Sequence, residues 1–228
     1  MDVSLYYEEK GNGFPLILLH GNGEDHQYFV HQTEHFCRYY RVIALDTRGH
    51  GRSPRGKWDF SIKRFAEDLH DFMKEHGIEK ADIVGFSDGG NIALYFAQKH
   101  PEMVRKLVLN GANLDPSGVK RSVQLPIELG YAAAKLFSRI SEKAAKNAEM
   151  LGLMVNEPDI KPSELSSLKM PVLVIAGTKD MIKKKHTELI AKSIPGASLV
   201  FINGGHFIAN NQSESFNREL ERFLLRGN

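Results

Sequence analysis

Residues 82–99 read "DIVGFSDGGNIALYFAQK", and this stretch decides the fold. A run of apolar and β-branched residues ends at Phe86, a glycine-flanked Ser87 follows, and a helical pattern comes next. This order of strand, tight turn and helix is the setting of a nucleophile elbow, in which Gly85 and Gly89 let the strand and helix approach closely. The serine hydroxyl is then expected to project from the turn, beside helix amides that favour an anion.

The same alternation of strand and helix runs through most of the chain. Short apolar runs predict buried strands at 15–19, 41–45, 82–86, 106–110, 172–176 and 198–202. Helical patterns occur at 27–36, 62–75, 90–99, 183–194 and 213–225. We therefore predict an α/β fold, with a mostly parallel twisted sheet covered by helices on both faces. The alternating segment "VSLYYEE" at 3–9 adds an antiparallel edge strand.

Residues 114–168 interrupt this alternation with helical patterns and no strand signal. We expect them to form a small helical cap, inserted after the strand near 106–110. Residues 1–113 and 169–228 then form the core of a single structural domain. The apolar residues of the insertion have helical spacing, which favours packing over the lining of a cavity. They are Leu125, Leu129, Phe137, Met150, Leu151, Leu153 and Met154.

Composition narrows the possible partners. The 228 residues are 42% hydrophobic and 25% charged with a net charge of +2, which is ordinary for a globular protein and indicates no nucleic-acid partner. No leader pattern and no long apolar run occur, so we expect a cytoplasmic location without a membrane partner. A single cysteine, Cys37, excludes an internal disulfide and a multi-cysteine metal site. No metal or cofactor is expected, and the oligomeric state is not predicted.

A serine nucleophile needs a base, and that base needs an acid to orient it. Asp180 follows one predicted strand in "VLVIAGTKD", and His206 follows the next in "LVFINGGHF". Parallel strands place these loops on the same edge of the sheet as Ser87. We therefore predict a catalytic triad of Ser87, His206 and Asp180, with Asp115 as the substitute acid.

A tetrahedral intermediate also needs hydrogen-bond donors for its oxyanion. The turn "HGNG" at 20–23 follows a buried strand, and the backbone amide of Asn22 can pair there with the backbone amide of Asp88. We expect His20 to be structural, because the loop after the last strand already supplies a base. Asn22 and Asp88 are thus the predicted oxyanion-hole donors.

With these segments in place, the chain resembles the α/β-hydrolase superfamily. The motifs that support the resemblance are "HGNG", "DTRGHGRS" at 46–53, "GFSDGG", "GTKD" and "GGHF", in the family's order. The resemblance implies a carboxylesterase-like serine hydrolase without a cofactor, acting on a small-molecule ester. Because "DTRGHGRS" is mostly structural in the family, His50 and Arg52 receive no catalytic role.

The side chain of Asp88 has two interpretations. Its carboxylate lies in the first turn of a helix, where negative charge is favourable by about 0.3 to 1 kcal/mol. "GFSDGGNIAL" is also similar to the elbow of the valacyclovir hydrolase (biphenyl hydrolase-like) group, which implies that Asp88 binds the ammonium group of an α-amino acid ester. The sequence leaves both interpretations open.

Other functions are compatible with parts of this pattern. Cofactor-free hydrolysis of C–C bonds and perhydrolysis use a similar triad, and a small-molecule receptor could retain the fold without catalysis. A dinucleotide-binding turn at "LLHGNGEDH", with Asp46 as the ribose ligand, fits less well. His26 occupies the position where that motif requires a third, very small residue.

Overall fold

The structure is a computed structural model, and it describes residues 2–226. Its sheet has seven strands in the order β1-β3-β2-β4-β5-β6-β7. They are β1 (Tyr7–Lys10), β2 (Pro15–Leu19), β3 (Arg41–Leu45), β4 (Ala81–Phe86), β5 (Val104–Asn110), β6 (Val172–Gly177) and β7 (Ser198–Ile202). Only β1 runs antiparallel, against β3. The predicted sheet is confirmed, although its edge strand is shorter than the alternating segment.

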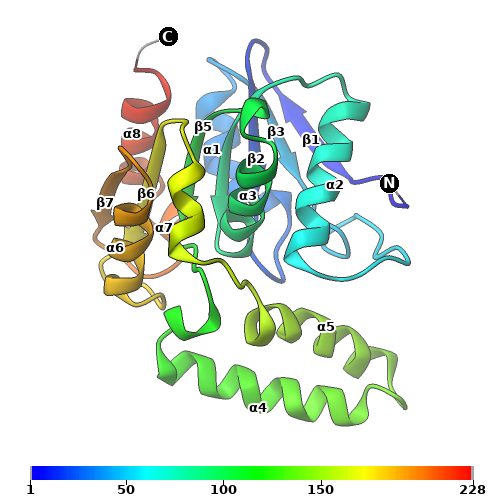
Figure 1. Ribbon diagram of the computed structural model, residues 1–228. Helices are drawn as coiled ribbons and strands as arrows, with labels where there is room; N and C mark the ends of the chain where they lie inside the picture. The colour runs from blue at the N-terminus through cyan, green and yellow to red at the C-terminus, as the bar shows by residue number, and fades with distance from the viewer. Residues whose placement is uncertain (1, 227–228) are drawn as a thin grey trace.

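Helices cover both faces of this sheet (Figure 1). The α-helices are α1 (Val30–Phe36), α2 (Ile62–Glu75), α3 (Asp88–Lys99), α4 (Arg121–Phe137), α5 (Glu142–Asn156), α6 (Lys184–Ser193), α7 (Ile208–Asn211) and α8 (Ser213–Leu224). Short 3-10 turns lie at η1 (His26–Phe29), η2 (Pro101–Met103), η3 (Pro116–Gly118) and η4 (Pro162–Ser167). The helix prediction is therefore also confirmed, with α1 shortened by the turn at η1.

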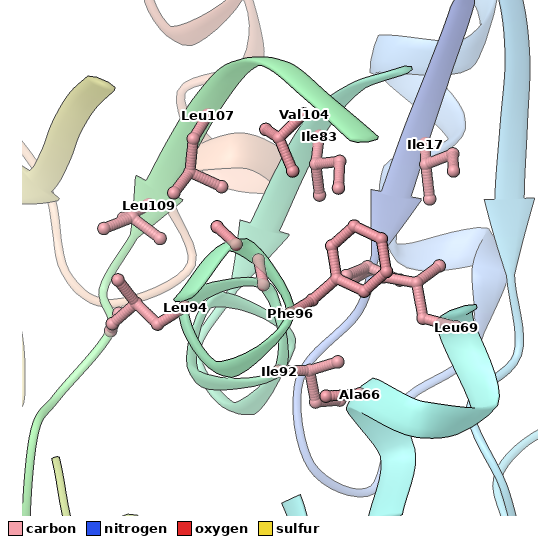
Figure 2. Close-up of a cluster of buried hydrophobic side chains, with 14 of the residues drawn as sticks. Ile17, Ala66, Leu69, Ile83, Ile92, Leu94, Phe96, Val104, Leu107 and Leu109 are labelled. Carbon is pink, nitrogen blue, oxygen red and sulfur yellow. The ribbon is translucent and has the colours of Figure 1, made fainter. Parts of the chain in front are cut away.

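The pleat of each strand divides its side chains between two cores. In β2, Ile17 belongs to the core under α2, α3 and α6, whereas Leu16 and Leu18 belong to the core under α1 and α8. Figure 2 shows the first core, where Phe96 of α3 and Leu69 of α2 lie close to Ile17. Because both faces of the sheet are buried, its central strands read as continuous apolar runs.

Local signals explain where the helices begin and which side they bury. Ser61 precedes α2, and its hydroxyl accepts a hydrogen bond from the backbone amide of Arg64 at 3.1 Å. The apolar residues of α2 then recur every three or four positions and face the sheet. An N-cap followed by this spacing is sufficient to predict α2 from the sequence.

Helices α4 and α5 lie between β5 and β6 in the chain and pack against each other. Figure 1 shows them as a pair at one end of the sheet, with α5 nearer to the strands and α4 outermost. Leu153 of α5 is buried in the core under α2 and α3. The pair occupies the part of the chain in which no strand is expected.

Candidate active site

The turn between β4 and α3 holds Ser87 in a strained backbone conformation. Ser87 has φ +52° and ψ −119°, and within residues 2–226 it is the only residue other than glycine with a positive φ. A Cβ atom at Gly89 would collide with the carbonyl oxygen of Leu19, and one at Gly85 would collide with that of Gly89. The glycines around Ser87 are therefore required by close backbone contacts, as expected for an elbow.

The structure brings Ser87, His206 and Asp180 together. Nε2 of His206 lies 3.1 Å from Oγ of Ser87, and Nδ1 of His206 lies 2.7 Å from Oδ1 of Asp180. Asp180 follows β6 and His206 follows β7, so the loops after two neighbouring strands supply the base and the acid. This geometry lets a proton move from the hydroxyl to the imidazole while the carboxylate stabilises the resulting charge.

Packing fixes the imidazole ring of His206. Its centroid lies 4.7 Å from the Phe86 ring and 5.5 Å from the Phe207 ring, and the residue is mostly buried. A Cβ atom at Gly111 would lie 2.8 Å from Cε1 of His206, so no larger residue fits beside the ring. Asp115, the substitute acid, instead accepts a hydrogen bond from the backbone amide of Ser117 at 2.8 Å.

The turn after β2 lies directly against the serine. A Cβ atom at Gly21 would be 3.1 Å from Cβ of Ser87, so the backbone of this turn borders the hydroxyl. The backbone amides of Asn22 and Asp88 donate to no other protein atom among residues 2–226. Both amides are therefore available to a negatively charged oxygen beside Ser87.

His20 supports this turn from below. Its Nδ1 lies 2.7 Å from the carbonyl oxygen of Gly21, and its Nε2 accepts a hydrogen bond from the backbone amide of Thr47 at 3.0 Å. Burial lowers the pKa of His20 to about 4, so the ring stays neutral near pH 7. Both ring nitrogens are thus used in structural hydrogen bonds.

The side chain of Asp88 is enclosed by amides. Its carboxylate accepts hydrogen bonds from Nδ2 of Asn22 at 3.0 Å and from Nδ2 of Asn91 at 3.2 Å. Asn91 also donates to Oδ1 of Asn113 at 3.1 Å. Burial raises the pKa of Asp88 to about 6, although the two amides oppose that shift. Asp88 thus belongs to a polar network that extends from the turn after β2 to the segment after β5.

Glu24 is a second carboxyl group near the site, and the sequence analysis did not identify it. One of its oxygens accepts a hydrogen bond from the backbone amide of Gly21 at 3.2 Å. Burial raises the pKa of Glu24 to about 7, and the charge of His206 opposes this shift. The only sequence signal was an acidic residue two positions after Asn22, which by itself is common in surface turns.

The inserted segment 114–168 contacts the site through helix α5. Nδ2 of Asn22 donates to the carbonyl oxygen of Met150 at 2.8 Å, in addition to its bond with Asp88. A hollow of about 790 Å³ also borders α5, where Tyr131 and Glu149 are among its lining residues. None of Ser87, Asp88 or His206 lines this hollow, so we do not assign the substrate to it.

The outer helix α4 differs from the expectation of packed apolar side chains. Leu125, Leu129 and Phe137 are exposed, whereas Leu153 of α5 is buried. Helical spacing favoured packing for these residues, and in α4 that expectation is wrong for the three exposed ones. The spacing could not indicate whether a side chain faces the protein or the solvent, because this depends on how the cap is placed.

The "DTRGHGRS" segment forms a structural turn in which Asp46 and Arg48 are buried. Asp46 accepts hydrogen bonds from the backbone amides of His26 and Arg52, both at 2.7 Å. It also contacts Nδ1 of His26 at 2.8 Å, which leaves its carboxylate no role as a ribose ligand. Arg48 is fully buried and pairs with Asp68 through two contacts of 2.6 and 2.7 Å. These pairs explain why the segment is charged yet internal.

Comparison with known proteins adds independent evidence. The model of a family described as alpha/beta hydrolase fold matches residues 15–149. A 2-hydroxymuconate semialdehyde hydrolase from Pseudomonas putida is 33% identical over 257 residues, covering 95% of this chain and 89% of that protein. Serine hydrolase BPHL from Homo sapiens is 29% identical over 246 residues, covering 97% of this chain and 83% of that protein.

A solved structure shows the same architecture. The structure described as "Est816 as an N-Acyl homoserine lactone degrading enzyme" superposes with a TM-score of 0.79 at 27% identity. The superposition covers 97% of each chain. The likeness therefore extends over the strands that position Ser87, Asp180 and His206.

Proposed function

Because the chain belongs to the α/β-hydrolase family, which confirms the fold and the enzyme class expected from its motifs, we propose that it cleaves a small carboxylic ester through an acyl-enzyme on Ser87. The observation that carries this proposal is the line of contacts from Ser87 through His206 to Asp180, at 3.1 and 2.7 Å. Relatives and structural neighbours that are hydrolases support the reaction class.

The proposed reaction has two half-reactions. In the first, Oγ of Ser87 attacks the ester carbonyl carbon while Nε2 of His206 takes the hydroxyl proton. The backbone amides of Asn22 and Asp88 hold the oxyanion of the tetrahedral intermediate. The C–O bond to the alcohol then breaks, and His206 gives its proton to the leaving oxygen.

In the second half-reaction, His206 takes a proton from water as that water attacks the acyl carbon. Collapse of the second intermediate releases the carboxylic acid and returns the proton to Ser87. Asp180 accepts the Nδ1–H hydrogen bond throughout and keeps the imidazole in the tautomer that this sequence requires. Residues 114–168 act in this proposal as a cap over the site.

Hydrolysis of a C–C bond is the second candidate function. It is favoured by the 33% identity to a 2-hydroxymuconate semialdehyde hydrolase, which is higher than the identity to BPHL. The same serine, base and oxyanion donors would serve, but the leaving group would be carbon and would need protonation at carbon. A vinylogous 1,5-diketone acid therefore distinguishes this reaction from ester hydrolysis.

The α-amino acid esters are the narrower substrate class within the first proposal. Asp88 is the acidic residue next to Ser87, and the identity to serine hydrolase BPHL is consistent with this class. Asp88 as a residue is only 8% exposed, and its carboxylate is already held by Asn22 and Asn91. A substrate ammonium group would have to join or replace these two amide donors.

The test combines labelling with turnover. Purified protein is expected to react with a fluorophosphonate probe and to hydrolyse short-chain nitrophenyl esters, and Ser87→Ala should abolish both. A panel then compares neutral, anionic and α-amino esters with a C–C substrate. Absence of labelling and of turnover in the unchanged protein would reject the acyl-enzyme and favour a non-catalytic receptor.

The role of the Asp88 side chain needs its own comparison. If it binds an ammonium group, Asp88→Asn should reduce kcat/KM for an α-amino ester at least tenfold more than for the matching neutral ester. Equal losses on the two esters would indicate that the carboxylate serves the turn and the helix instead. The backbone amide of residue 88 is present in both proteins, and any effect of the exchange on the bond to Asn22 should lower turnover of the two esters equally.

A further inference from the structure

Helix α4 presents an apolar stripe to solvent. Its outer side and the residues just past its end carry large hydrophobic side chains that are strongly exposed. These residues, which we call the outer stripe, are Leu125 (42% exposed), Leu129 (64%), Leu136 (75%), Phe137 (52%) and Ile140 (82%). A contiguous exposed apolar patch on a folded protein usually marks an interaction site.

The outer stripe lies on the side of α4 that faces away from α5. The side that faces α5 is identified by Gln124, whose side-chain amide donates from Nε2 to the carbonyl oxygen of Met154 at 3.1 Å. A Cβ atom at Gly130 would likewise lie 3.4 Å from Cδ1 of Leu151. A surface helix normally buries its apolar side and exposes its polar side. In α4 large apolar side chains also lie on the side away from α5, and Figure 1 shows no other element of residues 2–226 over that side.

The segment that contains this stripe is also basic. Residues 120–143 include five Lys and Arg but two Asp and Glu, a net charge of +3 in a chain whose total is +2. Arg139 and Lys143 are exposed at the end of the stripe, and among residues 2–226 neither pairs with a carboxylate. Basic residues therefore flank the outer stripe.

We propose that α4 docks in the plane of an anionic lipid surface, with the outer stripe in the acyl boundary and the basic residues at the head groups. Exposed leucine, isoleucine and phenylalanine beside Lys and Arg are the features of an interfacial amphipathic helix. Each basic residue near an anionic surface adds to the attraction. A second copy of the chain would instead bring the same positive charge to the contact.

This inference does not require a membrane-spanning segment. Among residues 2–226, no helix combines the length and apolar character needed to cross a bilayer. The sequence expectation of no membrane partner rested on that criterion, which does not apply to a helix lying in the interface. Docking through α4 would bring the cap, and the site behind α5, to the lipid surface. The proposed docking of α4 does not depend on which bond Ser87 cleaves.

The test measures binding of the full chain to vesicles. Vesicles of phosphatidylglycerol and phosphatidylcholine should co-sediment with the protein at low salt, whereas pure phosphatidylcholine vesicles should bind at least tenfold less. The double variant Leu129→Glu, Leu136→Glu should lose binding at least tenfold. Leu189→Glu is the matched control, because Leu189 on α6 is also exposed but lies outside the cap. It should bind as the unchanged protein does.

A second variant separates charge from apolar contact. Arg139→Gln with Lys143→Gln keeps the outer stripe and should weaken binding to the anionic vesicles severalfold, with a smaller dependence on salt. Circular dichroism and turnover of a soluble ester verify that each variant is folded. The proposal is overturned if the unchanged protein does not bind anionic vesicles, or if Leu189→Glu loses as much binding as the stripe variant. It is also overturned if the chain is a dimer that the stripe variant converts to a monomer.

Discussion

The side-chain amide of Asn22 donates hydrogen bonds to the carboxylate of Asp88, at 3.0 Å, and to the carbonyl oxygen of Met150, at 2.8 Å. Asn22, whose backbone amide is a proposed oxyanion donor, is thereby tied to Asp88 and to helix α5. These two bonds of the Asn22 side chain help to hold the turn after β2 in place. The proposed oxyanion donors and helix α5 are thus connected through one side chain.

From this contact we expect Asn22→Ala to lower kcat for a short neutral ester about tenfold, the equivalent of one well-placed hydrogen bond. KM should change less, because the side chain positions the oxyanion donor rather than the substrate. Steady-state kinetics measure both parameters. Asn156→Ala is the control, since its amide bonds to the carbonyl oxygen of Gly152 within α5 at 3.0 Å. An equal loss in that variant would mean that general loosening of the cap explains the effect.

The raised pKa of Asp88 predicts a pH dependence of stability. Burial raises this pKa from 3.8 to about 6, so the folded protein binds the proton more tightly than the unfolded chain between these values. The free energy of unfolding therefore falls as the pH rises from about 4 to 6, by about 3 kcal/mol for this group. Asp88→Asn removes the titration, so its Tm relative to the unchanged protein should increase as the pH is raised through that window.

Thermal unfolding at pH 4.5 and pH 7.5 provides the measurement. The Tm difference between Asp88→Asn and the unchanged protein should be larger at pH 7.5 by several degrees. Asp25→Asn is the control, because Asp25 is partly exposed and caps η1 through a bond to the amide of Gln27. A Tm difference that is the same at the two pH values would show that the buried carboxyl of Asp88 does not titrate in this range.

The sequence was sufficient to predict the site residues that the ends of the parallel strands position. Ser87, Asp180 and His206 each follow a parallel strand, and strands of that kind deliver their next loop to one edge of the sheet. The strands themselves were readable because buried strands form continuous apolar runs. A pattern confined to a few neighbouring residues therefore predicted contacts across more than a hundred positions.

What the sequence could not predict depends on how separate elements meet. The contact of Asn22 with Met150 joins residues 128 positions apart, and no local pattern marks either partner. Burial of the Glu24 carboxyl follows from its neighbours in space rather than from the turn that contains it. Which apolar side chains of α4 remain exposed is set by its packing on α5. In each case the missing information was tertiary.

The backbone strain at Ser87 predicts different stabilities for Ser87→Gly and Ser87→Ala, two variants that lack the hydroxyl. With φ at +52°, any residue that has a Cβ atom is disfavoured there, and glycine is not. Ser87→Gly should therefore be more stable than Ser87→Ala by about 1 kcal/mol, after allowing for the greater freedom of glycine in the unfolded chain. This corresponds to a Tm higher by about 2 to 4 °C. Equal Tm values would show that the elbow stores no strain at this residue.

Replacing the carboxylate of Asp180 by the carboxamide of asparagine tests which acid orients His206. Asp180 accepts from the imidazole at 2.7 Å, and also from the backbone amide of Ile182 at 2.8 Å. In Asp180→Asn, the new amide donates to Nδ1 of His206 and forces the imidazole proton onto Nε2. The protonated Nε2 can then no longer accept the proton of Ser87. We expect kcat near pH 7 to fall by roughly a thousandfold or more.

The control for this exchange is Asp115→Asn, which makes the same chemical change in the alternative acid. Because Asp115 caps a short turn through Ser117, its loss should cost less than twofold in kcat. Labelling by the fluorophosphonate probe should slow in Asp180→Asn in proportion to kcat, since both reactions need the same activated hydroxyl. A large loss in Asp115→Asn with little change in Asp180→Asn would assign the orienting role to Asp115 instead, and the contact seen between Asp180 and His206 would then be structural.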